Sequence, residues 1–460
     1  MAKKQQQDSL MAAVLNGMKA GGIKEPEKAL TTIAAYWENM KWIDMYDPIT
    51  GRPCLAMEWM LGARGFPEGK VTQIRGSFSD AKSTLLYYIY GCAMRGSTLT
   101  DRKAWVMHIE TEGAPNSADY VARYGCDPRL FLHMKTNDLN DMFKKVDIFD
   151  MSLHGGRDGT VNPETGRAMK SKFPKEEALD PNLEKPTIVG IDSLSNVGTD
   201  AGNDFVDLDK SEKPGGDSKD IRRVFRAREQ DYDEHKLTMF VTTHETTEIK
   251  TGPGAGYGGP KSTARNQRAV GMALSIAIET HDMEWKGGKD GKEVLGSKQY
   301  LKTFKSKIAP KHRRIFLFRK LLGGYDMAET DLQFFMNADG KNNNCSANPF
   351  MPGGFLCPEG AKCGITKVRG GYSAPMISDK VFKTADEFVE ALYSDKDRLM
   401  KIRECLRIRG FGFPFETQYT VTSDTVEPGA ENENEDMEIP EESEEGEQTA
   451  SDAGAEEVEQ

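Results

Sequence analysis

The sequence predicts an α/β protein built on a mainly parallel, twisted sheet with helices on both faces, and three observations lead to this expectation. Short apolar segments alternate with helical stretches between residues 70 and 280, which is the order that parallel sheets require. One apolar segment, 71–74, enters a loop that carries a lysine and opens a helical stretch. Acidic and polar residues follow other apolar segments, at the strand ends where such sheets bind ligands.

Helices are expected where apolar residues recur with helical spacing. Over residues 8–45 this spacing predicts one or two helices, which Gly21, Gly22 and Pro26 interrupt. The same criterion predicts helices at 53–61, 85–92, 117–124 and 221–235, with a turn at 62–69.

Strands are expected where short apolar runs end at turn residues or acids. Residues 151–186 are rich in Gly, Lys, Pro and Asp without periodicity, which predicts a surface insertion. The strands are expected at 70–75, 104–109, 131–134, 187–192, 237–241 and 270–278, followed by a hairpin of 299–307 with 314–318.

The loop after residues 71–74 has the composition of a phosphate-binding loop. It approaches the pattern G-x-x-x-x-G-K-[ST], in which backbone N–H groups and the lysine hold phosphates and the following hydroxyl holds Mg²⁺. Ala81 replaces the second glycine, and a left-handed backbone at that position would be costly. The alternative is an ordinary Ser/Asp-rich turn before a helix. The residues concerned are Gly76, Ser77, Phe78, Ser79, Asp80, Ala81, Lys82, Ser83 and Thr84.

Acidic and polar residues follow three of the predicted strands, and we expect them to converge on Lys82. Glu112 is placed to orient or deprotonate an attacking water, and Asp192 to hold Mg²⁺ through water. Glu110 is a supporting acid or an alternative base. His244 either couples phosphate to the order of the next loop or is an ordinary core histidine. For both glutamates the alternative is an exposed acidic turn.

The length of 460 residues allows more than one domain. We expect an N-terminal helical or oligomerisation element at 1–46, a core at 47–338 and a C-terminal α+β domain at 339–422, followed by a disordered acidic tail at 423–460. Cys345, Cys357 and Cys363 lack paired C-x-x-C spacing, so zinc is not expected there.

The net charge of −11 arises in the tail, where residues 423–460 carry 16 Asp and Glu and no Lys or Arg. Residues 1–422 then carry 61 Lys and Arg against 56 Asp and Glu. A mildly basic body suits nucleic-acid binding. An acidic tail competes with nucleic-acid phosphates for the basic surface of that body. Seven scattered cysteines and the lack of an apolar run of about 20 residues predict an intracellular protein without a membrane partner.

Two segments are candidates for binding a DNA single strand. The glycine-rich stretch 251–260 combines an aromatic residue with basic flanks, which suits backbone neutralisation and base stacking; a plain linker is the alternative. Residues 197–216 are a candidate only through the family resemblance given below. They are acidic, so phosphate contacts there would come from the backbone, from Lys210 and Lys213, and from an arginine cluster in the next helix. The candidate DNA-binding residues are Lys250, Tyr257, Lys261, Arg265, Arg268, Arg222, Arg223 and Arg226.

The order of these motifs resembles the core of a RecA-family recombinase over residues 48–326, and is most similar to the UvsX-type strand-exchange proteins of large tailed phages. The resemblance rests on residues 50–76, on Glu112 within 109–114, on Tyr120 five residues before Gly125, on 188–193, on His244 and on 304–310. The chain departs from the family pattern in three places: at Ala81, in the insertion 151–186 and in residues 340–420.

The resemblance implies a RecA-type P-loop ATPase core that binds ATP and Mg²⁺. The catalytic residues are then Lys82, Glu112 and His244, and the Tyr120 ring packs on the base of the nucleotide. Lys305 and Lys307, which alternate on a strand, then reach the ATP of a neighbouring subunit; a solvated strand edge is the alternative.

The same resemblance implies a DNA-dependent ATPase that forms helical filaments on single-stranded DNA and exchanges strands with a homologous duplex, aided by a loading mediator and a single-strand-binding protein. Two rival functions are a RecA-fold scaffold with weak or no hydrolysis, which Ala81 motivates, and a hexameric helicase motor.

Overall fold

The computed structural model describes residues 40–95, 103–113, 117–127, 130–156, 160–161, 168–169, 173–198, 216–248, 261–264, 270–271, 273–287, 291–309, 311–336, 365–375 and 377–411. All of them belong to one compact unit, residues 1–415. The predicted acidic tail and most of the predicted N-terminal helices lie outside these ranges.

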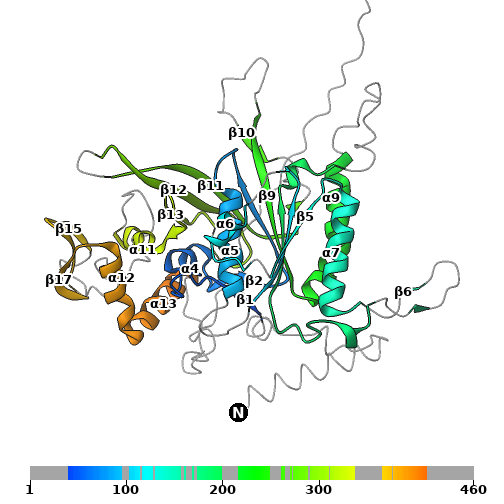
Figure 1. Ribbon diagram of the computed structural model, residues 1–460, viewed down its shortest axis with the longest axis horizontal. Helices are drawn as coiled ribbons and strands as arrows, with labels where there is room; N and C mark the ends of the chain where they lie inside the picture. Colours follow the sequence, from blue (N-terminus) through cyan, green and yellow to red (C-terminus); the bar gives the residue numbers. More distant parts are fainter. Residues whose placement is uncertain are drawn as a thin grey trace, which may run out of the picture. The chain divides into compact units, whose positions relative to one another are not determined.

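A ten-stranded sheet forms the centre of this unit, in the order β14-β13-β12-β11-β3-β9-β8-β4-β5, with β10 paired to β9 (Figure 1). The six strands from β11 to β5 are parallel, and the remaining pairings are antiparallel. The mixed α/β class with a mainly parallel sheet is therefore confirmed. The strands are β3 (Val71–Gly76), β4 (Trp105–Glu110), β5 (Phe131–Lys135), β8 (Thr187–Asp192), β9 (Leu237–Glu248), β10 (Lys261–Ala264), β11 (Leu274–Gly287), β12 (Glu293–Ser306), β13 (Arg314–Lys320) and β14 (Tyr325–Asp326).

Helices cover both faces of the parallel strands. Successive residues of one strand enter different cores: Val106 packs in the cluster with α5 and α4, and Met107 in the cluster with α7 and α9. This alternation is the two-sided burial that parallel sheets need. Figure 1 shows the two groups on opposite sides of the sheet. The helices are α4 (Leu55–Leu61), α5 (Lys82–Arg95), α6 (Ala118–Ala122), α7 (Leu139–His154), α9 (Gly216–Glu234) and α11 (Met327–Met336). None of the described helices is both long enough and apolar enough to cross a bilayer.

The C-terminal part of the described chain packs on α4 and α11. Arg403 forms a buried ion pair with Glu58 at 2.6 and 3.0 Å, and Tyr393 donates to Asp331 Oδ2 at 2.7 Å. Phe388 and Leu392 belong to the same apolar core as α5. The elements are β15 (Thr366–Val368), β16 (Gly371–Ala374), β17 (Ser378–Phe382), α12 (Ala385–Ser394) and α13 (Lys396–Phe411).

The predicted helix over 8–45 is wrong at its C-terminal end, and the predicted turn at 62–69 contains a strand. β1 (Trp42–Asp44) pairs antiparallel with β2 (Gly65–Pro67). The two backbones approach so closely that a Cβ on Gly65 would lie 1.8 Å from the Ile43 carbonyl oxygen. Pairing between distant segments overrides the helical spacing here.

The region around the predicted insertion also differs. Helix α7 was not predicted, and it runs to His154, four residues into the stretch 151–186. Within that stretch the structure describes two short strands, β6 (Thr160–Val161) and β7 (Ala168–Met169), and a 3₁₀ turn, η1 (Lys175–Glu177). A second turn, η2 (Leu194–Asn196), follows β8.

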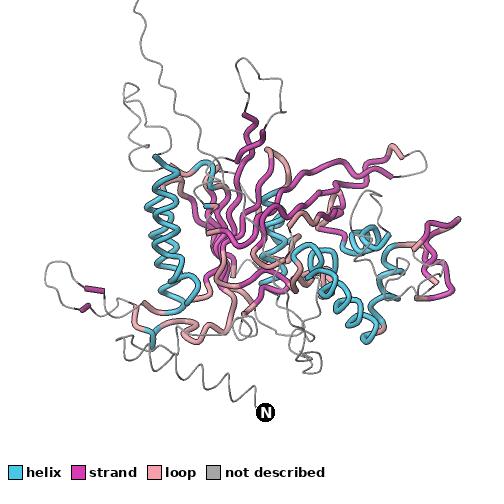
Figure 2. Tube along the Cα trace, turned by 180° about the vertical axis from the view of Figure 1, so that it is seen from behind, coloured by secondary structure: helices cyan, strands magenta, loops and turns pink. Residues whose placement is uncertain are grey.

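The predicted strand 270–278 is shifted and too short, because β11 begins at Leu274 and continues to Gly287. Beyond Glu279 it pairs with β12 alone. Figure 2 shows β11 and β12 as a long two-stranded ribbon that extends past the parallel strands. Polar residues alternate along such a ribbon, so its sequence lacks the continuous apolar run of a central strand.

Candidate functional site

The loop between β3 and α5 is held in place from outside. The Asp80 carboxylate accepts the Ser77 N–H at 2.6 Å, and Thr280 Oγ1 donates to the Asp80 carbonyl at 3.0 Å. The buried Gln299 amide donates to the carbonyls of Asp80 and Ala81, both at 3.2 Å. Ala81 adopts a left-handed φ of +55°, which costs an alanine about 1–2 kcal/mol. Contacts from Thr280 on β11 and Gln299 on β12 offset this strain and hold the loop in this conformation.

Lys82 folds back over its own loop. Its ammonium donates to the carbonyls of Ser77 at 2.7 Å and Gly76 at 3.2 Å, and lies 3.2 Å from His244 Nδ1. Burial lowers the pKa of this ammonium, although nearby carboxylates, the Asp192 carboxylate first among them, favour its charged form. The Lys82 ammonium therefore lies within the loop, where it would contact an anion held there.

His244 links this lysine to an acid on another strand. Its Nε2 lies 2.5 Å from Glu112 Oε1, and Ser193 Oγ donates to the same oxygen at 2.7 Å. A neutral imidazole with its proton on Nε2 satisfies both neighbours, because Nδ1 then accepts from Lys82. The Phe78 ring stacks on the imidazole at 4.2 Å and is itself largely exposed. The predicted residues Lys82, His244 and Glu112 thus form one continuous chain of contacts.

Asp192 ends β8 beside this chain. Its Oδ1 accepts from Thr242 Oγ1 at 2.5 Å, and its carbonyl accepts the Thr111 N–H at 2.9 Å. The Asp192–Ser193 peptide bond is cis. Ser83 follows Lys82 in the first turn of α5 and is half-buried. The oxygen atoms of Ser83 and Asp192 are the hard donors that Mg²⁺ prefers.

A cavity of about 410 Å³ adjoins the other side of the loop. Tyr120 lies at its edge and exchanges a hydrogen bond with Thr84 Oγ1 at 2.8 Å. Arg319 donates to the same Thr84 oxygen at 3.2 Å and to Asp282 at 2.8 Å. Sequence reasoning missed Arg319, Asp282 and Gln299, because no local motif marks these residues of the antiparallel strands.

Lys305 and Lys307 lie at the opposite end of the sheet from Lys82. Ser306, between them, pairs with Ile276, which in turn pairs with Thr72 at the start of β3. The Lys305 ammonium donates to the Gly271 carbonyl, and burial together with the Lys307 charge lowers its pKa. Lys307 is exposed beside a cavity of about 620 Å³. The expected strand alternation ends before Lys307, because β12 stops at Ser306.

The candidate DNA-binding residues are spread along two elements. Lys261 begins β10, which pairs with the end of β9 directly beyond His244, with Ala264 opposite Glu245. The three candidate arginines of α9 are exposed, and Arg226 borders the same cavity as Lys307, away from the loop. Arg222 and Arg223 lie on the same helix. Lys250, Tyr257, Arg265 and Arg268 lie outside the described residues.

No protein-family model matches the chain. Over 275 residues the chain is 26% identical to Protein RecA of Desulforapulum autotrophicum, and the match covers 58% of this chain. It spans 64% of that relative, which is less than two thirds of its length. This weak similarity supports a relationship to the RecA family, and the mainly parallel α/β sheet is compatible with it.

Proposed function

We propose that this chain is an ATP-dependent DNA recombinase of the UvsX type found in phages. It would assemble as a helical filament on single-stranded DNA in the host cell and exchange strands with a homologous duplex. Loading mediators and single-strand-binding proteins would be further partners. The similarity to Protein RecA supports an activity of this kind at the family level.

The observation that carries the proposal is the chain of contacts from Lys82 through His244 to Glu112. Lys82 would bind the β- and γ-phosphates and release its hold on His244 and on the loop carbonyls. His244 lies at the base of the β9–β10 hairpin. A change at the γ-phosphate would therefore be transmitted to residues 251–260, the proposed DNA loop, as in other switches that a γ-phosphate orders.

Glu112 would orient the attacking water and accept its proton. Both of its side-chain partners, Ser193 and His244, contact Oε1, and the side chain keeps 31% of its surface exposed. It is thus held in place but reachable by water. Mg²⁺ bound by Ser83 and, through water, by Asp192 would neutralise phosphate charge. Tyr120 would pack on the base in the 410 Å³ cavity.

Lys305 and Lys307 would complete the site of a neighbouring copy. Within one chain they lie at the far end of β3 from Lys82, so their proposed ATP contact requires a second subunit. A head-to-tail interface of this kind generates a helical filament when it does not close into a ring. The proposed DNA contacts remain the basic and aromatic residues Lys250, Tyr257, Lys261, Arg265, Arg268, Arg222, Arg223 and Arg226.

The test is phosphate release from ATP with and without single-stranded DNA. The wild type is expected to be stimulated by DNA, and Lys82→Ala to lose turnover. Lys145→Ala removes a lysine from the surface of α7, where it pairs with Asp141, and should retain full turnover. Unchanged turnover in Lys82→Ala would refute the site. Imaging in the same buffer distinguishes filaments from the closed hexamers of a helicase.

A second candidate function is a DNA-binding scaffold with weak or no hydrolysis. Ala81 favours it, because an alanine with a left-handed φ of +55° stands where the P-loop pattern asks for a glycine. Binding of ATP without DNA-stimulated phosphate release would support the scaffold over the recombinase.

A further inference from the structure

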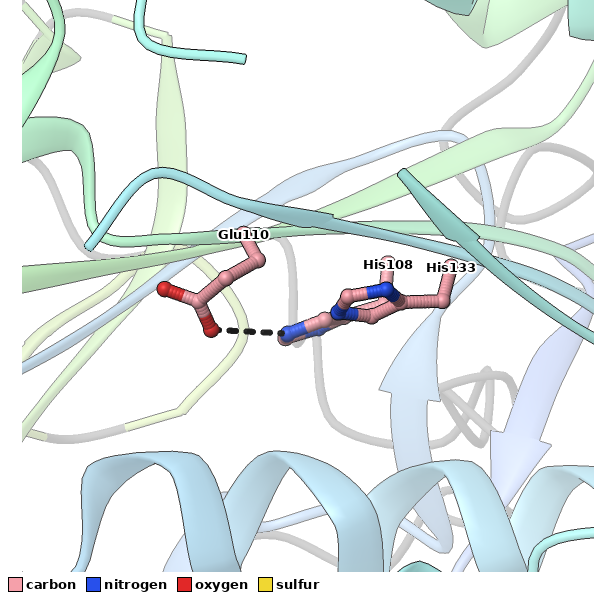
Figure 3. A group of neighbouring side chains, drawn as sticks. All are labelled: His108, Glu110 and His133. Atoms are coloured by element: carbon pink, nitrogen blue, oxygen red, sulfur yellow. Dashed lines mark ion pairs between the residues drawn. The ribbon is translucent and has the colours of Figure 1, made fainter. Parts of the chain in front are cut away.

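Three potential metal ligands share one face of the sheet on β4 and β5. His108 and Glu110 alternate along β4 and therefore point the same way. His133 on β5 is the register partner of His108, and the two rings stack with centroids 5.7 Å apart. Figure 3 shows the Glu110 carboxylate directed at the histidine pair.

The separations within this group are close to those of a metal site. His108 Nε2 lies 3.8 Å from Glu110 Oε2, and one ligand atom from each residue falls within 4.8 Å of the other two. Bonds of about 2.1 Å at tetrahedral angles place ligand atoms about 3.4 Å apart. His133 is exposed, so rotation of its side chain can supply the remaining approach. Among the residues that the structure describes, this is the one group of three His, Cys, Asp or Glu with such spacing.

A second observation concerns the buried ring of His108. Its side chain is fully buried, and its Nε2 makes no hydrogen bond within the described chain. The other ring nitrogen, Nδ1, lies 3.3 Å from the Tyr90 hydroxyl, an outer partner of the kind that fixes a ligating histidine. Gly190 leaves room for that hydroxyl, since a Cβ there would lie 1.4 Å from it. A buried ring nitrogen that makes no hydrogen bond, faces Glu110 and belongs to a ring held from the other side has the arrangement of a metal ligand.

We propose that His108, Glu110 and His133 bind a divalent first-row transition metal ion, with Zn²⁺ as the natural candidate. Two imidazoles and one carboxylate select such an ion over Mg²⁺ or Ca²⁺, which prefer oxygen ligands alone. The group thus differs in chemistry from the oxygen donors Ser83 and Asp192. Solvent reaches it through His133 on β5, the last strand of the described sheet order.

This group of three residues is connected to Glu112 by a hydrogen bond through Glu110. Glu110 Oε1 accepts the Glu112 backbone N–H at 2.7 Å, while its Oε2 faces His108. The two carboxylate oxygens thus have separate partners, and a metal ion on Oε2 would leave the backbone contact in place. Metal binding itself does not depend on the proposed ATPase activity.

The experiment titrates the full-length protein with Co²⁺ in excess Mg²⁺ and follows the visible absorption of the bound ion. We expect one Co²⁺ per chain, displaced by Zn²⁺. His133→Asn removes the exposed ligand and should weaken binding at least about tenfold. His312→Asn makes the same change at another exposed histidine and should leave binding unchanged. Absence of Co²⁺ binding by the wild type, or equal affinity in the two variants, would overturn the proposal.

A third variant replaces the ligand instead of deleting it. His133→Cys offers a thiolate at the same strand position, so bound Co²⁺ should gain a sulfur-to-metal charge-transfer band that the wild type lacks. A merely structural role for His133 would not produce this band, and its absence from Co²⁺-treated His133→Cys would contradict ligation at this position.

Discussion

His244 Nε2 lies 2.5 Å from Glu112 Oε1, although the two residues are 132 positions apart in the sequence. The contact joins the carboxyl ends of β4 and β9, with β8 between them. It gives the predicted catalytic acid a partner whose other nitrogen reaches Lys82.

Glu112→Gln should lower kcat for ATP hydrolysis by about 10²–10⁴ because an amide cannot accept the proton of the attacking water. Nucleotide affinity should change little, since the amide is isosteric. Binding of a fluorescent ATP analogue and steady-state phosphate release measure the two effects. Glu176→Gln alters an exposed glutamate in η1 and serves as the matched control. A variant Glu112→Gln with wild-type kcat would remove Glu112 from the mechanism.

Ala81→Gly should raise the free energy of unfolding by about 1 kcal/mol. Glycine adopts the left-handed φ of +55° at this position without the steric cost that alanine bears. Ala227→Gly, in the exposed interior of α9, should instead lower stability by about 1 kcal/mol. Urea unfolding of both variants measures the difference. Destabilisation of similar size in both would show that the loop conformation carries no strain.

The sequence predicts contacts between neighbouring residues better than contacts between residues that are far apart in the chain. The strand, loop and helix around Lys82 are contiguous, so their local pattern was sufficient. Arg319 reaches Thr84 across 235 positions, and only the folded sheet brings them together. For the same reason the helical expectation for residues 8–45 is wrong at its end. Trp42 and Ile43 lie in β1, and their pairing with residues 65–67 depends on contacts between distant parts of the chain.

Arg403→Met should lower the free energy of unfolding by about 3–5 kcal/mol because it leaves the buried Glu58 carboxylate without its guanidinium. Arg398→Met removes the neighbouring arginine of α13, whose partner Asp395 is exposed, and should cost less than about 1 kcal/mol. The double variant Glu58→Met with Arg403→Met should recover most of the loss. Equal effects of the two single variants would contradict a buried ion pair that anchors α13 to α4.

Stability should fall between pH 5 and pH 8 through Asp331. Burial raises the pKa of this carboxyl to about 7, from an ordinary value of 3.8. The unfolded state therefore loses the proton first, and the stability present at low pH disappears as pH rises through about 7, by roughly 2–3 kcal/mol over this interval. Asp331→Asn should remove this pH-dependent part of the free energy of unfolding. Chemical denaturation of both proteins at pH 5 and pH 8 measures it. An unchanged pH dependence would show that Asp331 is already ionised at pH 5.

In the proposed filament one ATP is bound between two copies of this chain, and mixing two inactive variants tests this arrangement. Lys82→Ala damages the loop, and the double variant Lys305→Ala with Lys307→Ala damages the opposite edge of the sheet, so each protein alone should be inactive. Randomly mixed filaments would contain intact sites at about one quarter of their interfaces. We predict DNA-stimulated ATP hydrolysis at about one quarter of the wild-type rate in an equal mixture. No recovery on mixing, or full activity of the double lysine variant alone, would contradict a shared site.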